Sequence, residues 1–491
     1  MTTSPQQVTD SPDTIAAPLK ASRRQLLKGS ACLAALSPWL SACSTSSDNN
    51  PSDPWNQLEA IRARIQPPTF ADQDFLITAF GAISGKEHDA SVAIQSAINA
   101  CHQAGGGRVV VPAGEFYCGP LVLKSNVNLH LQQDATLRFY PEPERYVGPV
   151  FTRWEGTELM GNQPLIYAYQ QQNIAITGKG TLDGMADKDH WWPWTGEWSR
   201  ATWTVIPEQQ AKFTKEPLRE MADAGVEVSD RQFSPNYLRP PFIQPYDCDN
   251  VLIEGVTIRN SPFWLIHPVL CRNVTVSGVT CISHGPNSDG CDPESCSYVL
   301  IKDCLFDTGD DCIAIKSGRD ADGRRVNMPC ENVIIENCLM KEGHGGVVIG
   351  SEISGGVRNV FAQNCQMSSP DLERGIRIKT NALRGGHLAN LHYRNITIGQ
   401  VKDAVVINFH YEKVHEGPFD PVLENISIDN LLVEHAQRAF MLDGLEAVPI
   451  RGVSLTNLTF KRVEKDNIVR HVAELTQDNI VINQQPVRIE V

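Results

Sequence analysis

The stretch Asn250-Val-Leu-Ile-Glu-Gly-Val-Thr-Ile258 decides the fold, because its pattern recurs along the second half of the chain. An asparagine is followed by apolar-x-apolar, two polar or small residues, and apolar-x-apolar again. Further copies read Asn273-Val-Thr-Val-Ser-Gly-Val-Thr-Cys281, Tyr298-Val-Leu-Ile-Lys-Asp-Cys-Leu-Phe306 and Asn332-Val-Ile-Ile-Glu-Asn-Cys-Leu-Met340. Weaker copies start at Asn359, Asn390, Asn425 and Gly452, and an isolated earlier one starts at Asn173.

From Asn250 onward, successive copies start 23 to 35 residues apart, a spacing typical of a solenoid. Alternation of apolar and polar residues within each copy indicates short strands. No helical pattern of useful length separates the copies, so we expect the strands of one coil to pair with the equivalent strands of the next. The sequence therefore predicts an all-β fold, a parallel β-helix, with residues 70–491 as a single domain.

The same repeat explains three cysteines. Cys304, Cys338 and Cys365 each lie six residues into their copy, where other copies carry apolar residues. Equivalent positions of successive coils stack about 4.8 Å apart, so we expect these to be free thiols packed as small apolar side chains. Cys291 and Cys296 lie in a loop, where a disulfide remains an alternative. The Cys and His residues lack the ligand spacing of a zinc site.

Composition excludes several classes of protein. Of 491 residues, 41% are hydrophobic and 20% charged, which fits neither a disordered chain nor a coiled coil. The formal net charge of −14 argues against a nucleic-acid partner, because nucleic-acid binders present a basic face. Residues 301–400 differ from the rest of the chain, since 12 Lys and Arg there balance 12 Asp and Glu.

The first 43 residues are interpreted as an export signal. Ser22-Arg23-Arg24-Gln25-Leu26-Leu27-Lys28 resembles a twin-arginine signal, and the apolar stretch from Gly29 to Leu40 is too short to span a bilayer. Leu40-Ser41-Ala42-Cys43 resembles a bacterial lipobox with Cys43 as the lipidated residue; cleavage by an ordinary signal peptidase is the alternative. Residues 44–69 would then be a tether. We expect an exported protein, a periplasmic or cell-surface lipoprotein that touches the membrane only through its lipid.

Two further segments interrupt or precede the coils. Residues 70–140 are expected to form a small N-terminal cap and the first coils, with an amphipathic helix over Ala90–Ala104 that ends at Gly105-Gly106-Gly107. Between about 185 and 245 the repeat disappears, which indicates a long insertion rich in tryptophan. We expect most of these tryptophans to pack, and at least one to lie near substrate.

Polar residues on three neighbouring coils are expected to form one site. Asp310 lies 12 residues into the coil that starts at Tyr298, and His344 lies 12 residues into the coil that starts at Asn332. Equal offsets in adjacent coils place the two on one face. Arg377 and Lys379, alternate residues of a strand, share a face in the next coil. The predicted site comprises the acids Asp289, Asp310 and Asp311 with His344, Arg377 and Lys379.

Paired carboxylates suit glycoside hydrolysis. One acid must hold a proton, and crowding by like charges is expected to raise its pKa, while the others activate water. A separation of about 6.5–9.5 Å between the two functions leaves room for water and inverts the anomeric centre. The two cations beside the acids suggest an anionic substrate, such as a uronic-acid polymer.

These residues resemble the motifs of glycoside hydrolase family 28, the polygalacturonase family. The four motifs read Asn287-Ser288-Asp289, Gly309-Asp310-Asp311, Gly343-His344-Gly345 and Arg377-Ile378-Lys379, and the likeness runs from about Phe75 to the last coils. The resemblance implies a right-handed parallel β-helix and inverting hydrolysis of α-1,4-linked galacturonic acid in pectin, without a metal or another cofactor.

The resemblance also implies roles for single residues. Asp310 would be the general acid, Asp289 and Asp311 the pair that activates water, and His344 a partner that tunes the acid. Arg377 and Lys379 would hold the substrate carboxylate on the leaving-group side. Asn287 and Tyr411 complete the predicted substrate-binding residues.

Two features depart from the common family pattern. Ser288 stands where threonine is commoner, and the insertion at 185–245 together with Asp292-Pro293-Glu294-Ser295 resembles the bacterial exo-acting branch. Loops that close one end of a groove would admit only chain ends. Three alternatives stay open: hydrolysis of another pectic linkage such as rhamnogalacturonan, a pectate lyase, and a non-catalytic carbohydrate-binding β-helix.

Overall fold

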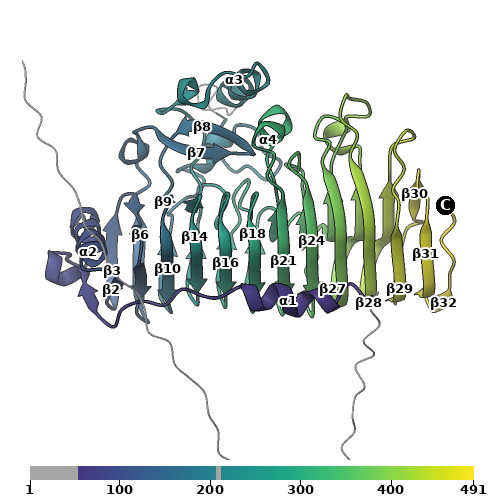
Figure 1. The fold of residues 1–491 in the computed structure, drawn as a ribbon, viewed down its shortest axis with the longest axis horizontal. Helices are drawn as coiled ribbons and strands as arrows, with labels where there is room; N and C mark the ends of the chain where they lie inside the picture. Colours follow the sequence, from purple (N-terminus) through teal and green to yellow (C-terminus); the bar gives the residue numbers. More distant parts are fainter. Residues whose placement is uncertain (1–52, 206–211) are drawn as a thin grey trace, which may run out of the picture. The chain divides into compact units, whose positions relative to one another are not determined.

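The computed structural model describes residues 53–205 and 212–491. Within them the chain winds into a right-handed parallel β-helix whose coils lie side by side (Figure 1). The predicted fold class is therefore confirmed. The leader, the lipobox and Cys43 lie outside the described residues. None of the helices in the described residues is long and apolar enough to cross a bilayer.

The first of three parallel ladders contains the asparagine-led strands that the repeat predicted. Its register is strict: Val251 pairs with Val274, Val274 with Val299, and Val299 with Val333. In chain order the ladder comprises β1 (Asp74–Leu76), β2 (Gly107–Val111), β5 (Val127–Leu131), β10 (Gln172–Gly178), β14 (Asp249–Glu254), β16 (Arg272–Ser277), β18 (Ser297–Lys302), β21 (Cys330–Glu336), β24 (Val357–Gln363), β27 (His387–Asn408), β28 (Val422–Asp443), β29 (Val453–Phe460) and β31 (Leu475–Ile482).

The second ladder contains the second apolar-x-apolar of each copy. It comprises β3 (Gly114–Cys118), β6 (Ala135–Phe139), β11 (Thr181–Asp183), β15 (Thr257–Arg259), β17 (Thr280–Ser283), β19 (Leu305–Thr308), β22 (Leu339–Met340) and β25 (Gln366–Met367), and it continues into β27. From β27 onward the strands run through the bend between the first two ladders, and β27 and β28 continue into the third ladder as well.

The third ladder forms the remaining side of each coil. It comprises β4 (Leu121–Val122), β9 (Ile166–Tyr169), β13 (Ile243–Tyr246), β20 (Ile313–Ile315), β23 (Val347–Ile349), β26 (Arg374–Lys379), the ends of β27 and β28, and β30 (Ile468–Arg470). Single bridges through Ile266 and Cys291 connect β13 to β20. The short β32 (Gln485–Pro486) pairs antiparallel with β31.

The leading asparagines have a physical explanation. Asn250, Asn273 and Asn332 adopt left-handed backbone conformations with φ between 56° and 59°, which asparagine tolerates better than most residues. Each side chain also bonds its neighbour, as Asn250 Nδ2 does to Asn173 Oδ1 at 2.8 Å. Turn geometry and a side-chain ladder thus select the same residue in successive coils.

The cysteine prediction is confirmed. Cys304, Cys338 and Cys365 are free, buried and stacked in consecutive coils. Cys291 and Cys296 are also free and buried, so the alternative of a bridge between them fails. All twelve cysteines in the described part of the chain are buried free thiols.

The N-terminal end of the solenoid is closed by α2 (Ser91–Gln103), where the sequence predicted an amphipathic helix. Its apolar face carries Ile94, Ile98 and Cys101 into the core. The glycine run after it has positive φ throughout, which ends the helix and turns the chain into β2.

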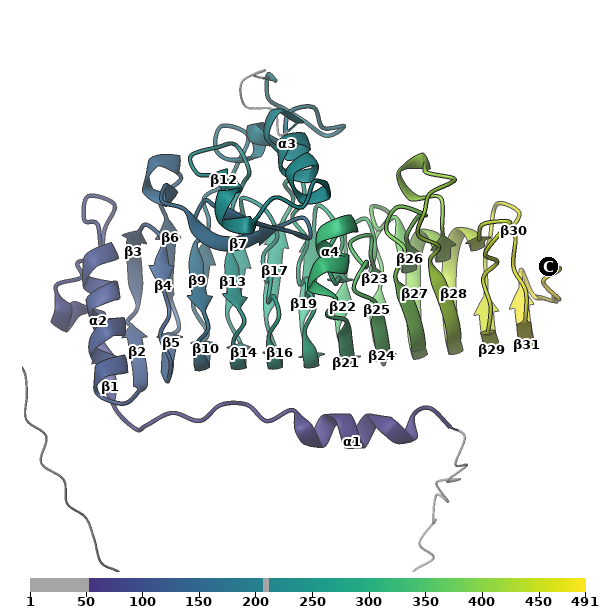
Figure 2. The same cartoon turned by 45° about the horizontal axis from the view of Figure 1, so that its top comes forward.

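The predicted tether at 44–69 needs correction over its described part. Residues Asn56–Arg64 form α1, which lies along the first ladder beneath the central coils (Figure 2). Leu58, Ile61 and Ile65 pack against Leu300, Ile334 and Phe361. The periodicity of three apolar residues in so short a segment was too weak to separate a docked helix from a linker.

The insertion forms a roof above the early coils. It contains α3 (Lys212–Asp223) and β12 (Gln232–Phe233), and β12 joins the hairpin of β7 (Val150–Trp154) and β8 (Thr157–Gly161) in a small sheet. A short helix, α4 (Asp320–Val326), contacts α3 from the catalytic coils. Regular coils resume at β13, as the predicted boundary near 245 required, whereas the hairpin at 150–161 was not anticipated.

Candidate active site

The predicted catalytic residues emerge from one edge of the solenoid, where the chain turns from the second ladder to the third. Asp289 follows β17, Asp310 and Asp311 follow β19, and His344 follows β22, so consecutive coils supply them. Their side chains need close backbone approach. A Cβ on Gly345 would lie 2.4 Å from a Val348 methyl and 3.2 Å from an Asp311 oxygen, so only glycine fits beside that carboxylate.

The three carboxylates converge. One oxygen from each of Asp289, Asp310 and Asp311 lies within 4.8 Å of the others. This is shorter than the separation of about 6.5–9.5 Å that the sequence analysis anticipated for an acid and a base on opposite sides of the scissile bond. The site thus contains a compact acidic group, and carboxylate spacing does not by itself identify an inverting enzyme.

Asp310 and His344 form the pair expected from their equal offsets. His344 Nδ1 lies 2.9 Å from Asp310 Oδ1, and the Asp311 amide donates to the same oxygen at 2.9 Å. Burial opposes the ionisation of Asp310, but the charge and hydrogen bond of His344 outweigh it and hold the pKa of Asp310 below its ordinary value. The negative charge of Asp310 in turn raises the pKa of His344.

This direction corrects one expectation. Crowding by like charges was expected to raise the pKa of the acid, yet the imidazole dominates at Asp310. The two opposite shifts favour the form of the pair in which the proton lies on His344 and Asp310 is a carboxylate.

Asp311 lies beneath the cavity floor and is fully buried. Lys379 Nζ contacts its Oδ2 at 2.7 Å and Arg377 Nη1 contacts its Oδ1 at 3.2 Å. Burial opposes the charge of Asp311, but these two cations hold its pKa below the ordinary value. Arg377 and Lys379 therefore have a fixed partner in the protein before any substrate binds.

Asp289 has the opposite balance. Burial, and then the charges of Asp292 and Asp310, raise its pKa well above the usual value for a carboxyl group. Its Oδ2 lies 3.7 Å from Lys316 Nζ, and its Oδ1 has no hydrogen-bond partner among the described residues. Of the three acids, Asp289 is the one that most readily takes up a proton.

A cavity of about 220 Å³, the catalytic cavity, joins these groups. Its lining includes every predicted site residue except Asp311, namely Asn287, Asp289, Asp310, His344, Arg377, Lys379 and Tyr411. The Tyr411 ring lies 5.2 Å from Lys379 Nζ. Asn287 Oδ1 accepts a 2.7 Å hydrogen bond from Arg239.

Sequence reasoning missed a second set of lining residues. They are charged or aromatic and come from the roof and from neighbouring coils: Glu155, Lys215, Trp264, Lys316, Arg319, Glu352 and Glu412. No repeat offset marks them, because loops of different length precede them in each coil. Lys316 had one usable signal: like Lys379, it follows an alternating apolar pattern in the third ladder.

An adjoining cavity of about 290 Å³, here called the end chamber, lies under the roof. It shares Glu155, Lys215 and Asn287 with the catalytic cavity, so these three residues border both cavities. The remaining lining comes from Trp154, Thr195, Glu216, Arg219 and Arg239. The expectation that a tryptophan of the insertion lies near substrate is wrong for these two cavities, because their tryptophans are Trp154 of the hairpin and Trp264 of the solenoid, while Trp191 and Trp194 of the insertion are buried.

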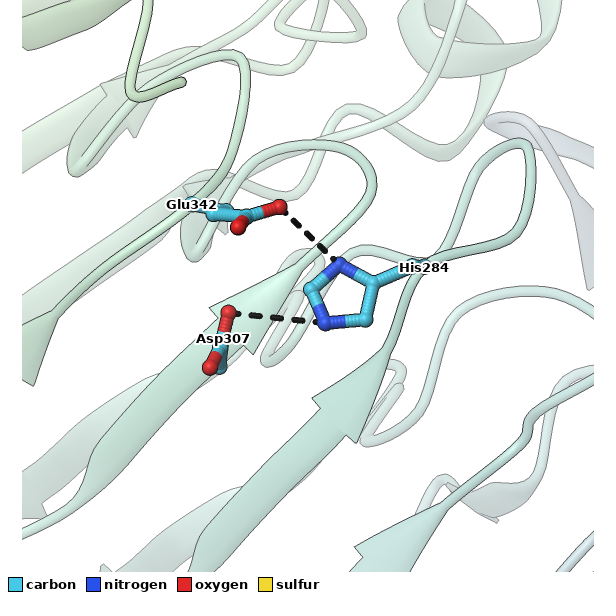
Figure 3. A group of neighbouring side chains, drawn as sticks. All are labelled: His284, Asp307 and Glu342. Carbon is cyan, nitrogen blue, oxygen red and sulfur yellow. Dashed lines mark ion pairs between the residues drawn. The ribbon is translucent and has the colours of Figure 1, made fainter. Parts of the chain in front are cut away.

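Within residues 53–205 and 212–491, two groups of side chains have the donor atoms and spacing that a cation requires. One is the acidic group itself; the other is His284 with Asp307 and Glu342, next to the catalytic loops (Figure 3). The imidazole of His284 already faces both carboxylates, at 3.5 Å and 3.4 Å. The acidic group faces Lys316, Lys379 and Arg377, whose charges occupy the place of a cation. That the reaction needs no metal stays a prediction.

Comparison with known proteins agrees with this geometry. Residues 227–477 match the profile of glycosyl hydrolases family 28. A probable polygalacturonase of Vitis vinifera is 28% identical over 83% of this chain and 77% of its own length. An exo-poly-alpha-D-galacturonosidase of Dickeya chrysanthemi is 28% identical over 68% of this chain and 57% of its own length.

A solved structure shows the likeness in three dimensions. The crystal structure of a hyperthermoactive exopolygalacturonase from Thermotoga maritima superimposes with a TM-score of 0.84 at 40% sequence identity. The alignment covers 88% of this chain and 96% of that protein.

Proposed function

The chain belongs to glycosyl hydrolases family 28 and is a glycoside hydrolase, and we propose that it cleaves α-1,4-linked galacturonate in pectin or oligogalacturonides from chain ends. One observation carries the substrate class. Arg377 and Lys379 meet a compact acidic group at a single cavity, in a protein whose net charge is −14. Cations at that position attract a uronate carboxylate that the rest of the surface repels.

In the proposed reaction Asp310 is the general acid. The proton comes from the Asp310–His344 pair, which keeps one proton over a wide pH range because its members stabilise each other. A bound uronate brings negative charge and excludes water, and both effects favour the protonated form of Asp310. Asp310 then gives that proton to the glycosidic oxygen as the bond to the anomeric carbon breaks.

Asp289 and Asp311 would share the task of activating water. Asp289, with its raised pKa, accepts the proton of the water, while Asp311, held as a carboxylate by two cations beneath the cavity floor, assists through its negative charge. The new hydroxyl forms on the anomeric carbon, Asp310 has lost one proton and Asp289 has gained one, so exchange with solvent restores the site. We propose that the anomeric centre inverts, as the family resemblance implies.

The roof supports the exo mode. It lies above the earlier coils (Figure 2). The end chamber is lined in part by the roof residues Lys215 and Arg219 and does not include Arg377 and Lys379, which belong to the proposed leaving-group side. A chain that enters from the later coils would stop against α3. The likeness to the exopolygalacturonase of Thermotoga maritima, over 88% of the chain at 40% identity, also supports this mode.

We further propose that the enzyme is exported, with Cys43 lipidated, and works at the periplasmic or cell-surface side of a membrane. The support is the twin-arginine and lipobox pattern of the sequence. Mass spectrometry of the membrane fraction tests it: a diacylglyceryl modification on Cys43 is expected, and a soluble chain cleaved elsewhere would contradict it.

The deciding experiment uses the protein without residues 1–43 on polygalacturonate in EDTA. Reducing ends should rise without new ultraviolet absorbance, the galacturonate monomer should appear before longer products, and proton NMR should show the inverted anomer first. An unsaturated chromophore would indicate a lyase, and an absence of reaction would direct attention to a rarer pectic linkage such as rhamnogalacturonan. Early appearance of mixed oligomers would indicate internal cleavage.

A further inference from the structure

Lys316 is a nearly buried lysine in the lining of the catalytic cavity. It directly follows β20, its backbone amide donates to Pro293 O at 3.0 Å, and its carbonyl accepts from the Ser295 amide at 2.9 Å. These bonds fix Lys316 to the loop that contains Asp292. The side chain is 2% exposed, so its charge acts on its neighbours with little screening by water.

The ammonium group of Lys316 has three neighbours. It lies 3.7 Å from Asp289 Oδ2, 3.3 Å from Glu352 Oε2 and 4.5 Å from the centroid of the Trp264 ring. Glu352 is also held by Arg319 at 3.3 Å, so that carboxylate does not depend on Lys316 alone. Asp289 does: among the described residues, Lys316 is the one cation within 4 Å of it.

Asp292 is a second acid that acts on Asp289, and its own carboxyl group has no such partner among the described residues. It is fully buried, and neither of its carboxyl oxygens has a hydrogen-bond partner in the described part of the protein. One oxygen of Asp289 is also unpartnered. An unpaired buried carboxyl is expensive, and it lies immediately beside the acid that the mechanism uses as a base.

We propose that Lys316 is a positioning residue that holds Asp289 toward the cavity and offsets Asp292, so that Asp289 can accept the proton of the attacking water. The inference rests on the proposed function, since it concerns the base of that reaction. Lys316 lines the catalytic cavity but is only 2% exposed, and the role assigned to it is to act through Asp289.

Other charged groups also face Asp289. Asp310 and Asp311 from the next coil raise its pKa, as Asp292 does, whereas Lys316 lowers it. Arg239 of the roof is within electrostatic range from the other side. Three acids therefore oppose the effect of Lys316. Removal of the Lys316 charge should raise the pKa of Asp289, and removal of the Asp292 charge should lower it.

The test is the pH dependence of kcat/KM for Lys316→Met and Asp292→Asn. The acidic limb reports the base that must lose its proton. In Lys316→Met that limb should move up by about 1–3 pH units, and in Asp292→Asn it should move down, because an opposite charge and a like charge shift a pKa in opposite senses. Lys316→Arg should restore the limb toward the wild type, and Lys302→Met, a change to a partly exposed lysine of β18, should leave it in place.

A second readout does not need turnover. Asp292 with a raised pKa in the folded state contributes its stability below the unfolded pKa near 4 and loses it as pH rises through the folded value. Asp292→Asn should therefore melt higher than the wild type at pH 7, with the gap closing toward pH 4. If the acidic limbs of the kcat/KM profiles of Lys316→Met and Asp292→Asn stay in place, or shift in the same direction, the inference is wrong. Failure of the wild type on polygalacturonate would instead refute the proposed function.

Discussion

At the scale of single residues, the pairing of Asp310 with His344 shows that the pKa of an acid and its ability to deliver a proton in the reaction are separate properties. An isolated acid donates its proton only if its own pKa is high, whereas a carboxylate hydrogen-bonded to an imidazolium can receive a proton at the moment of reaction. The structure favours the second arrangement, because the pKa of Asp310 is lowered while that of His344 is raised.

This arrangement predicts the behaviour of His344→Gln. The wild type should lose activity as pH rises through the raised pKa of His344, when the pair gives up its proton. In the variant Asp310 must hold the proton alone, so the basic limb of the kcat profile should move to lower pH, and kcat near neutrality should fall by about 10²-fold. A profile unchanged in shape would contradict the shared proton.

Arg377→Ala gives a prediction about the substrate carboxylate. Lys379 remains on Asp311 at 2.7 Å, so the site should keep its geometry. Loss of one charge-assisted hydrogen bond should lower kcat/KM for oligogalacturonate by about 10–100-fold. A methyl-esterified oligomer serves as the control substrate and should lose much less. Equal losses on both substrates would show that Arg377 acts through Asp311 alone.

The residue scale is also where prediction from sequence succeeded and then stopped. Repeat offsets brought Asp310 to His344, and strand alternation brought Arg377 to Lys379. Neither signal reports the sign of a pKa shift, which depends on burial and on the nearest opposite charge. Lys316 and Asp292 were missed for a related reason, since their importance comes from what surrounds them and not from a recognisable motif.

At the scale of elements, the roof decides how much of a polymer chain can enter. Helix α3 brings Lys215 and Arg219 to within 3.0 Å and 2.8 Å of Glu155 in the β7–β8 hairpin. Leu218 between them is fully buried against Trp154 and Trp264, so helix, hairpin and solenoid share one small core. The roof is therefore anchored to the solenoid, and its residues Lys215 and Arg219 line the end chamber.

Lys215→Met tests whether the roof contributes to substrate binding. Lys215 lines both cavities, so its loss should raise KM for trigalacturonate by about tenfold, while Arg219 keeps Glu155 in place and thermal stability changes little. Lys179→Met, on a remote part of the solenoid, is the matched control. A change in kcat without a change in KM would argue against a role in chain-end binding.

The elements also show why the solenoid could be predicted from the sequence more fully than the hairpin and the helix that are added to it. Each coil repeats the pattern of the previous one, so nine weak signals reinforce a single interpretation. The hairpin at 150–161 and helix α1 occur once, and their short amphipathic patterns have no second copy to support them. The tether prediction failed on α1 because only contacts with Leu300 and Phe361 reveal that the helix is docked.

At the scale of the whole molecule, the described solenoid has a core made almost entirely of stacked equivalents. Valine lies on valine along the first ladder, asparagine on asparagine at the turns, and cysteine on cysteine beside the second ladder. Each coil contacts chiefly its neighbours, so stability accumulates along the stack. Catalysis uses the same geometry, since its residues come from consecutive coils.

The buried thiols have a consequence of their own. Twelve sulfhydryl groups lie along the stack from Cys101 to Cys365, each out of reach of solvent. A small alkylating reagent should leave all of them unmodified in the native enzyme and label them only as coils separate. Peptide mapping after brief exposure to the reagent at rising denaturant concentrations would then show the order in which the coils separate. The cysteines thus serve as natural probes of where unfolding begins.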